Sequence, residues 1–307
     1  MCGVCGCGQD EARIEEPHGL RLPDHARTTD PWHAADAPTH RHTHADGATH
    51  AHPHPHAHEH GHGGPAHEHA GTAHEHQPPS LPGRSATRLV AVEQDILARN
   101  KAVAAANRSA FQAARTLALN LVSSPGSGKT TLLVATLKRI GNDYPVAAIE
   151  GDQETTADAD RIRATGTPAI QINTGRGCHL DADQIRAAAQ RLGILNAGIL
   201  FIENVGNLVC PASFDLGEDH KVVIVSVTEG EDKPLKYAAM FAASDLMVIT
   251  KCDLLPHLDF DVDRLVDNAR RINPAIGVLK LSAKSGDGMD RWMRWLEAAR
   301  ALRLATD

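Results

Sequence analysis

The stretch Ser123-Ser124-Pro125-Gly126-Ser127-Gly128-Lys129-Thr130-Thr131 decides the fold of this 307-residue chain. An apolar run over 117–122 precedes it and a helical pattern over 132–140 follows. A strand, a glycine-rich turn and a helix start in this order predict a phosphate-binding P-loop, because backbone N–H groups and the helix dipole surround the phosphate.

Within that loop, Gly126 and Gly128 allow the backbone to approach phosphates closely. Lys129 can reach the β- and γ-phosphates, and the Thr130 hydroxyl can bind Mg²⁺. Ser123 stands where the pattern G-x-x-x-x-G-K-[ST] has glycine, which is a departure at the loop's entry. The predicted phosphate-binding residues are Gly126, Ser127, Gly128, Lys129, Thr130 and Thr131.

Composition divides the chain near Gly83, because large apolar residues are scarce before it. We expect a cysteine motif over 1–17, a disordered histidine-rich segment over 18–83 and one P-loop domain over 84–307. The formal net charge of -7 gives no footprint for nucleic acid. No apolar run could span a bilayer and no signal peptide follows Met1, which predicts a cytoplasmic protein with no membrane partner.

Three cysteines, Cys2, Cys5 and Cys7, lie within the first seven residues. Thiolates suit Zn²⁺, Ni²⁺ and Cu(I), and the intervening glycines allow the backbone to fold around an ion. The alternative is a redox dithiol, but such motifs belong at a helix start in a thioredoxin-like fold. We therefore interpret these thiols as metal ligands.

Seventeen of the twenty histidines lie between His18 and His76. The densest stretch places histidine at every second residue, as at His50, His52, His54, His56, His58, His60 and His62. This segment has no apolar face to bury, so we expect it to be disordered without metal. Imidazole suits Ni²⁺, Zn²⁺ and Cu²⁺, and at four ligands per ion the segment could hold roughly four ions. The pattern indicates a metal store; the alternative is a solvated linker.

After residue 83 the pattern alternates between strand and helix, which is typical of a doubly wound α/β fold with a mostly parallel sheet. An alanine-rich helix comes first and is expected to bury a face formed by Leu89, Val92, Ile96, Val103 and Phe111. Besides the strand before the P-loop, we expect strands over 146–149, 169–172, 198–202, 222–227, 246–250 and 278–281. Helices are expected over 157–165, 183–192, 261–272 and 289–303.

Two carboxylates follow predicted strands, at the sheet edge where such folds bind ligands. Asp152, in Glu150-Gly151-Asp152, is a candidate Mg²⁺ partner, either as a direct ligand or as a residue that contacts a ligand of the ion. Glu203 stands where a Walker-B carboxylate would, and Gly206 could offer its N–H to a γ-phosphate. A helix cap or a surface charge is the alternative for each carboxylate. Lys129, Thr130, Asp152 and Glu203 form the predicted catalytic set.

A further pair of motifs selects the base: Thr250-Lys251-Cys252-Asp253, and Ser282-Ala283-Lys284 after the last strand. The Asp253 carboxylate can accept from both N1–H and N2–H₂ of guanine, and the Ala283 N–H can donate to guanine O6. Adenine does not have the N1–H and N2–H₂ donors. The motifs favour GTP over ATP, with Lys251, Asp253, Ser282, Ala283 and Lys284 as base-binding residues.

Taken in order, the P-loop, Glu-Gly-Asp, the run 203–207, Thr-Lys-x-Asp and Ser-Ala-Lys-Ser-Gly-x-Gly-Met occur on one domain, and the cysteine motif precedes them. In this the chain resembles the HypB family of hydrogenase nickel-incorporation GTPases over 88–303 and the first seven residues. The histidine tract is similar to that of the nickel-storing members. The resemblance implies a P-loop NTPase of the SIMIBI type and the cofactors GTP/GDP, Mg²⁺, Ni²⁺ and Zn²⁺.

The resemblance also implies a metal site that spacing does not reveal, formed by Cys178, His179 and Cys210 at a dimer interface. It implies a GTP-dependent homodimer, a nickel-binding partner chaperone among other hydrogenase maturation factors, and the hydrogenase large subunit as the recipient. A buried thiol is the alternative for Cys210. For Cys252 the alternative of an ordinary thiol is stronger than for Cys210, because position x of the base motif needs no particular side chain.

The leading hypothesis is a GTPase metallochaperone that stores nickel and delivers it to hydrogenase. One rival is a nickel or zinc storage protein in which nucleotide binding is vestigial. A second rival is an ATP-dependent metal insertase of similar fold. No residue of the sequence is identified as the one that positions the attacking water.

Overall fold

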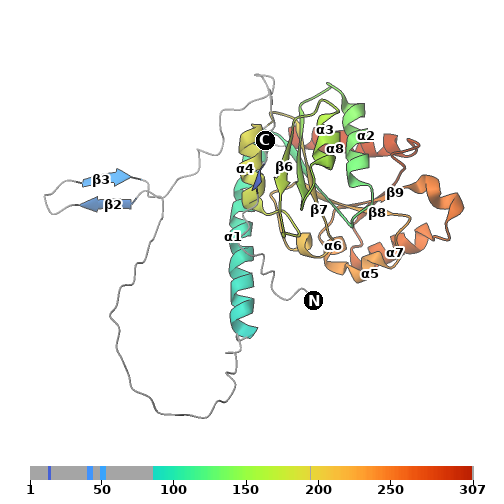
Figure 1. Cartoon of the computed structure of the whole chain (residues 1–307), viewed down its shortest axis with the longest axis horizontal. Helices are drawn as coiled ribbons and strands as arrows, with labels where there is room; N and C mark the ends of the chain where they lie inside the picture. The colour runs from blue at the N-terminus through green and yellow to red at the C-terminus, as the bar shows by residue number, and fades with distance from the viewer. Residues whose placement is uncertain (1–12, 15–39, 44–48, 53–85, 194, 306–307) are drawn as a thin grey trace, which may run out of the picture. The chain divides into compact units, whose positions relative to one another are not determined.

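A computed structural model describes residues 13–14, 40–43, 49–52, 86–193 and 195–305. Its main body is an eight-stranded sheet in the order β1-β6-β5-β7-β4-β8-β9-β10 (Figure 1). Neighbouring strands are parallel except for β1, which pairs antiparallel with β6. The strands are β1 Arg13–Ile14, β4 Leu117–Ser123, β5 Val146–Asp152, β6 Ala169–Asn173, β7 Ile199–Gly206, β8 His220–Ser226, β9 Leu246–Thr250 and β10 Gly277–Lys280. The predicted mostly parallel sheet is confirmed.

Helices cover both faces of this sheet: α2, α3 and α8 lie on one side, and α5, α6 and α7 lie on the other (Figure 1). Every strand and long helix expected from the sequence is present, with ends that differ by a few residues. The helices are α1 Ala86–Ala113, α2 Lys129–Ile140, α3 Ala157–Arg163, α4 Ala182–Leu192, α5 Lys233–Lys236, α6 Ala238–Ala242, α7 Val262–Ile272 and α8 Met289–Ala305. Two 3₁₀ turns, η3 Cys210–Ala212 and η4 Cys252–His257, also lie in the described part of this body.

Strand β4 shows why the sheet has two cores. Leu119 and Leu121 pack in a cluster with residues of α2 and α8, including Trp292, whereas Val122 packs with residues of α6 and α7 such as Phe241. Successive side chains of a strand point to opposite faces, so a continuously apolar strand indicates burial on both sides. This places the end of β4, and the P-loop after it, at the centre of the sheet's carboxyl edge.

Helix α1 buries a face that matches the expected one only in part, because Phe111 is buried as predicted. Val92 and Ile96 are 45% and 52% exposed, which contradicts the prediction that they pack inward. The buried stripe includes Asn100, Ala104, Asn107 and Phe111, which are spaced as one face of a helix. Its two asparagines are buried because their amides bind backbone groups, as Asn107 does at the carbonyls of Ala182 and Leu216. None of the described helices is long and apolar enough to cross a bilayer.

A two-stranded antiparallel hairpin, β2 His40–Thr43 and β3 Thr49–His52, belongs to a second unit of the chain. Its register pairs His40 with His52 and His42 with His50. The hairpin covers eight residues of the 18–83 segment for which disorder was expected, and the rest of that segment lies outside the described residues. Alternation with period two suits a strand, which accounts for the type of these two short runs.

Candidate nucleotide site and metal cluster

The P-loop joins β4 to α2 with Gly126 and Gly128 at positive φ, 73° and 97°. Those values are accessible to glycine at little cost, which explains the residue type at both positions. Lys129 Nζ donates to Ser123 Oγ at 2.8 Å. Ser123 is not among the positive-φ residues of the described chain, so the missing glycine does not distort the loop.

Two buried glutamates face the start of α2. Thr130 Oγ1 donates to Glu203 Oε1 at 2.6 Å, and Glu150 lies opposite Glu203 in the register of β5 and β7. Glu150 and Glu203 are 2% and 3% exposed, and the second carboxylate oxygen of each has no hydrogen-bond partner. Carboxylate and hydroxyl oxygens are ligands that Mg²⁺ accepts in proteins, so these residues fit the ion.

Burial changes the protonation of this group. It raises the pKa of Glu150 to about 9, with Glu203 adding a smaller contribution, and raises the pKa of Glu203 to about 7 despite Lys129 and Thr130 nearby. It also lowers the pKa of Lys129, against the pull of Glu203 and other carboxylates. Desolvation disfavours the charged form of each group. A bound phosphate would favour charged Lys129, and a divalent cation would favour the charged glutamates.

Asp152 and Gly206, which were also predicted to contact Mg²⁺ or phosphate, make contacts within the protein. The Asp152 carboxylate accepts from Gln153 N, Thr155 N and Thr155 Oγ1, so it holds the loop between β5 and α3 and does not cap the helix, whose N-cap residue is Thr156. A Cβ placed on Gly206 would lie 3.1 Å from Pro125 Cα, so only glycine lets β7 approach the P-loop this closely. Asp152 as an Mg²⁺ partner and Gly206 as a γ-phosphate donor stay predictions.

Beside the P-loop is a cavity of about 230 Å³ lined by the predicted base motifs: Gly128, Thr131, Thr250, Lys251, Asp253, Leu254, Ser282, Ala283 and Lys284. Two contacts tie these motifs to the loop. Thr250 Oγ1 donates to Ser127 O at 2.6 Å, and Lys251 Nζ donates to Gly126 O at 2.7 Å. Thr250, where asparagine is usual, therefore fixes the phosphate loop against the base motif.

Cys178, His179 and Cys210 come together, with one ligand atom from each within 4.8 Å of the others. Cys178 Sγ lies 3.6 Å from His179 Nδ1, and the imidazole packs on Phe214 at a ring separation of 3.9 Å. Burial lowers the pKa of His179, which favours the neutral form that binds metals. Two thiols and an imidazole suit Zn²⁺ or Ni²⁺. Cys252 lies apart, donating to Ile249 O at 3.4 Å.

Some predicted ligands cannot be placed. Cys2, Cys5, Cys7 and the histidines from His54 to His62 lie outside the described residues. His50 and His52 fall within β3.

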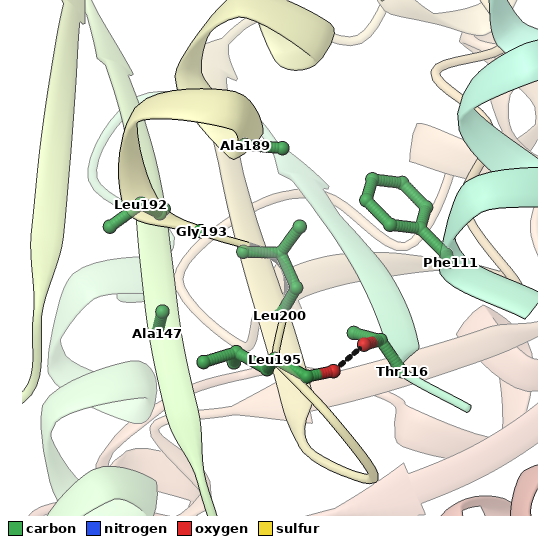
Figure 2. A pocket seen from close by; sticks show the side chains of 8 residues that line it. All are labelled: Phe111, Thr116, Ala147, Ala189, Leu192, Gly193, Leu195 and Leu200. Atoms are coloured by element: carbon green, nitrogen blue, oxygen red, sulfur yellow. Dashed lines mark hydrogen bonds between the residues drawn. The ribbon is translucent and has the colours of Figure 1, made fainter. Parts of the chain in front are cut away.

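A second cavity, under α1 and α4, is unsuited to a ligand. Figure 2 shows its apolar lining, which includes Phe111, Leu192 and Leu200, and the hydrogen bond from Thr116 Oγ1 to Leu195 O. Its volume of about 10 Å³ is close to that needed for a single water.

Sequence reasoning missed Glu150 and Asn204. Glu150 lies two residues before Asp152 and therefore on the same face of β5, but deeper in the sheet. Asn204, 1% exposed, accepts from Leu180 N at 3.1 Å. Its position directly after Glu203 was the available signal.

The chain is similar to proteins of one known family. Residues 117–280 match the CobW/HypB/UreG nucleotide-binding domain family. The chain is 54% identical over 304 residues to the hydrogenase maturation factor HypB of Azotobacter vinelandii, covering 99% of this chain and 94% of that protein. It is 62% identical over 219 residues to HypB of Escherichia coli K12, covering 71% and 76%.

Two solved structures resemble the main body. HypB of Archaeoglobus fulgidus has a TM-score of 0.62 at 40% identity, covering 66% of this chain and 99% of its own. HypB of Helicobacter pylori in complex with nickel also has a TM-score of 0.62, at 36% identity, covering 66% and 95%. The P-loop fold, the motif order and these similarities show that the chain belongs to the HypB family of hydrogenase maturation factors.

Proposed function

We propose that this chain is a GTP-hydrolysing metallochaperone that binds and stores nickel and delivers it during maturation of a nickel-containing hydrogenase. The observation that carries the proposal is that Cys210 of the candidate metal site lies on the turn that follows the strand of Glu203, a residue of the candidate phosphate site. Glu203 and Cys210 are seven residues apart, on β7 and on the turn that follows it. The name of the relatives and the nickel in the Helicobacter pylori structure support this reading.

The expected chemistry is phosphoryl transfer to water. Backbone N–H groups of the P-loop and the Lys129 ammonium would stabilise charge on the β- and γ-phosphates. Thr130 and Glu203 would hold Mg²⁺, with Glu150 close by, and the bound ion neutralises charge on the same phosphates. Turnover without a partner should be slow, because no described side chain is identified as positioning the water.

Base selection separates this proposal from an ATP-dependent insertase. The cavity beside Asp253 and Ala283 offers a carboxylate acceptor and an N–H donor, the complement of guanine's Watson–Crick edge. Steady-state hydrolysis of GTP and ATP by the full chain tests this directly. A higher kcat/KM for GTP supports the GTPase, whereas a preference for ATP would transfer the assignment to the insertase.

The central experiment measures whether nucleotide changes metal affinity. In the full chain with Cys2→Ser, Cys5→Ser and Cys7→Ser, thiolate-to-nickel charge-transfer absorption reports on Cys178 and Cys210. Nickel is titrated from a chelator buffer with GDP bound and then with a non-hydrolysable GTP analogue. A difference in affinity supports a GTP-driven carrier, and equal affinities would leave a static metal site.

The storage role rests on the histidines, and the register that pairs His40 with His52 and His42 with His50 supports it. Deleting 18–76 should remove most bound nickel and spare GTP hydrolysis. One or two tighter metal sites should remain, because the thiolates are untouched. If nickel stoichiometry barely fell, the segment would be a linker. If hydrolysis were absent from the intact chain, pure storage would be the better assignment.

The remaining parts of the proposal concern context. We infer a cytoplasmic protein that forms a GTP-dependent homodimer and can also hold Zn²⁺ at its thiolates. Its partners would be a nickel-binding chaperone, other maturation factors and the hydrogenase large subunit. Sedimentation with GDP and with the GTP analogue tests the dimer.

A further inference from the structure

Four polar side chains form a buried cluster beside β4 and β7: Asn120, Asn204, Glu218 and Lys221. They are 0%, 1%, 8% and 6% exposed. Burying amides and charges is costly unless each is hydrogen-bonded, and such a cluster in a sheet of apolar residues needs a reason. Each member is paired, and the pairs lead to both chain segments that hold the metal ligands.

The hydrogen bonds run from Asn204 in two directions, which we call the first and second arms. The first arm starts at Asn204 Oδ1, which accepts from Leu180 N at 3.1 Å and from Val205 N at 3.0 Å. Leu180 directly follows His179 and is fully buried. The amide of Asn204 therefore fixes the backbone that carries Cys178 and His179 to the end of β7.

The second arm leaves from the other side of the same amide. Asn204 Nδ2 donates to Asn120 Oδ1 at 3.2 Å, and Asn120 Nδ2 donates to Glu218 Oε1 at 3.0 Å. Glu218 Oε1 lies 3.7 Å from Lys221 Nζ. Glu218 Oε2 also accepts from Leu216 N at 2.6 Å.

Lys221 completes this arm at the turn that carries the third ligand. Its Nζ donates to Pro211 O at 3.0 Å and to Phe214 O at 3.2 Å. Pro211 follows Cys210 directly, and the Phe214 ring packs on His179. The two arms thus end on either side of the metal cluster.

Neighbouring residues of a strand point to opposite faces, so Glu203 and Asn204 divide the end of β7 between the two sites. Glu203 holds the Thr130 hydroxyl, and Asn204 holds the metal-binding segments. We propose that Asn204 is the positioning residue through which the nucleotide state at Glu203 sets the geometry of Cys178, His179 and Cys210. This inference rests on the proposed function, in which GTP changes nickel affinity.

The test uses the full chain with Cys2→Ser, Cys5→Ser and Cys7→Ser, and measures the ratio of nickel affinities with GDP and with the GTP analogue. Asn204→Ala removes the bond to Leu180 N and disconnects the second arm from β7, whereas Lys221→Met removes only the donor to the Cys210 turn. Allosteric couplings are typically about 5–150-fold, so we expect a ratio in that range for the parent and below about 2-fold for Asn204→Ala. Lys221→Met should fall between them.

Asn268→Ala is the matched control, because Asn268 is also buried and its Nδ2 binds a backbone carbonyl, that of Glu231, away from the metal cluster. A purely structural role for Asn204 would lower stability in both variants and leave both ratios at the parent's value, which would overturn the inference. If Asn204→Ala does not fold, an unchanged ratio in Lys221→Met overturns it instead. A parent ratio of one would reject the proposed carrier function itself.

Discussion

The Thr130 hydroxyl donates to Glu203 Oε1 at 2.6 Å, although the two residues are 73 positions apart. The contact joins the first turn of α2 to the end of β7, inside a site where both side chains are buried. When Glu203 is protonated, the site beside Thr130 attracts a divalent cation only weakly. With it charged, burial makes the cation's attraction strong because few waters screen it.

Glu203→Gln tests this relationship while keeping the side chain's shape. A hydrogen bond to a charged group contributes about 1.5–3 kcal/mol, so we expect Mg²⁺-dependent GTP affinity and hydrolysis to fall by roughly 10-fold or more. Calorimetric titration of GTP with and without Mg²⁺ measures the effect. Glu154→Gln is the control, because Glu154 is exposed in the loop after β5. Equal losses in both variants would remove Glu203 from the magnesium site.

The raised pKa values of Glu150, about 9, and Glu203, about 7, contribute to the pH dependence of stability. In the unfolded chain both groups are deprotonated above about pH 5, while the folded protein still holds their protons. Folded protein without nucleotide therefore binds more protons, and its free energy of unfolding should decrease from about pH 5 to about pH 9. Each group contributes at most about 1.4 kcal/mol per pH unit.

Denaturant unfolding at several pH values measures that slope, with Glu150→Gln as the comparison. The variant has no proton to lose at this position, so its stability should decline less than that of the parent between pH 7 and 9. Binding of Mg²⁺ with nucleotide needs the charged carboxylates and should release protons, so its affinity should increase with pH over the same range. Parallel stability profiles for parent and variant would show that Glu150 titrates normally.

Local patterns predicted most of the fold and brought together the residues of the candidate nucleotide site. The glycines of the P-loop and the apolar β4 decide backbone conformation within a few residues, so their placement followed from sequence alone. The base motifs line one cavity for a similar reason, since parallel strands end at the same edge of the sheet.

The parts that escaped prediction depend on contacts distant in sequence. The buried stripe of α1 contains asparagines, and only their carbonyl partners in the 182–216 region make burial favourable. The metal cluster was expected through family resemblance, because the convergence of Cys178 with Cys210 depends on how two loops pack. The role proposed for Asn204 depends on bonds to Leu180 and Asn120, which are 24 and 84 positions away in the sequence.

Asp253→Asn should change base preference. The variant loses the acceptor for the two guanine N–H groups and gains a donor that complements the 2-carbonyl of xanthine. An unmatched buried polar group costs about 1–3 kcal/mol, so GTP affinity should fall by roughly 5–150-fold and XTP should become the better ligand. Competition binding with GTP, XTP and ATP measures this. The same shift in Asp259→Asn, an exposed position nearby, would contradict the assignment.

Gly151→Ala tests how closely the nucleotide and metal sites are packed. A Cβ on Gly151 would lie 2.8 Å from three carbons of Leu180, which is fully buried and follows His179. Leu180 cannot move outward freely, because its N–H is held by Asn204. Overpacking a core typically costs about 1–3 kcal/mol, and here the strain should pass to the adjacent imidazole.

We therefore expect Gly151→Ala to weaken nickel binding at Cys178, His179 and Cys210 more than it weakens GDP binding, since Gly151 lies on β5 and outside the P-loop and base motifs. Nickel and GDP titrations of the same preparation give the two affinities. Gly230→Ala is the control: its Cβ would lie 2.7 Å from Asp232 Oδ1, but that side chain is 45% exposed and can rotate away. If Gly151→Ala left nickel affinity at the parent's value while unfolding more easily, Leu180 would repack without displacing His179, and the glycine would serve the sheet alone.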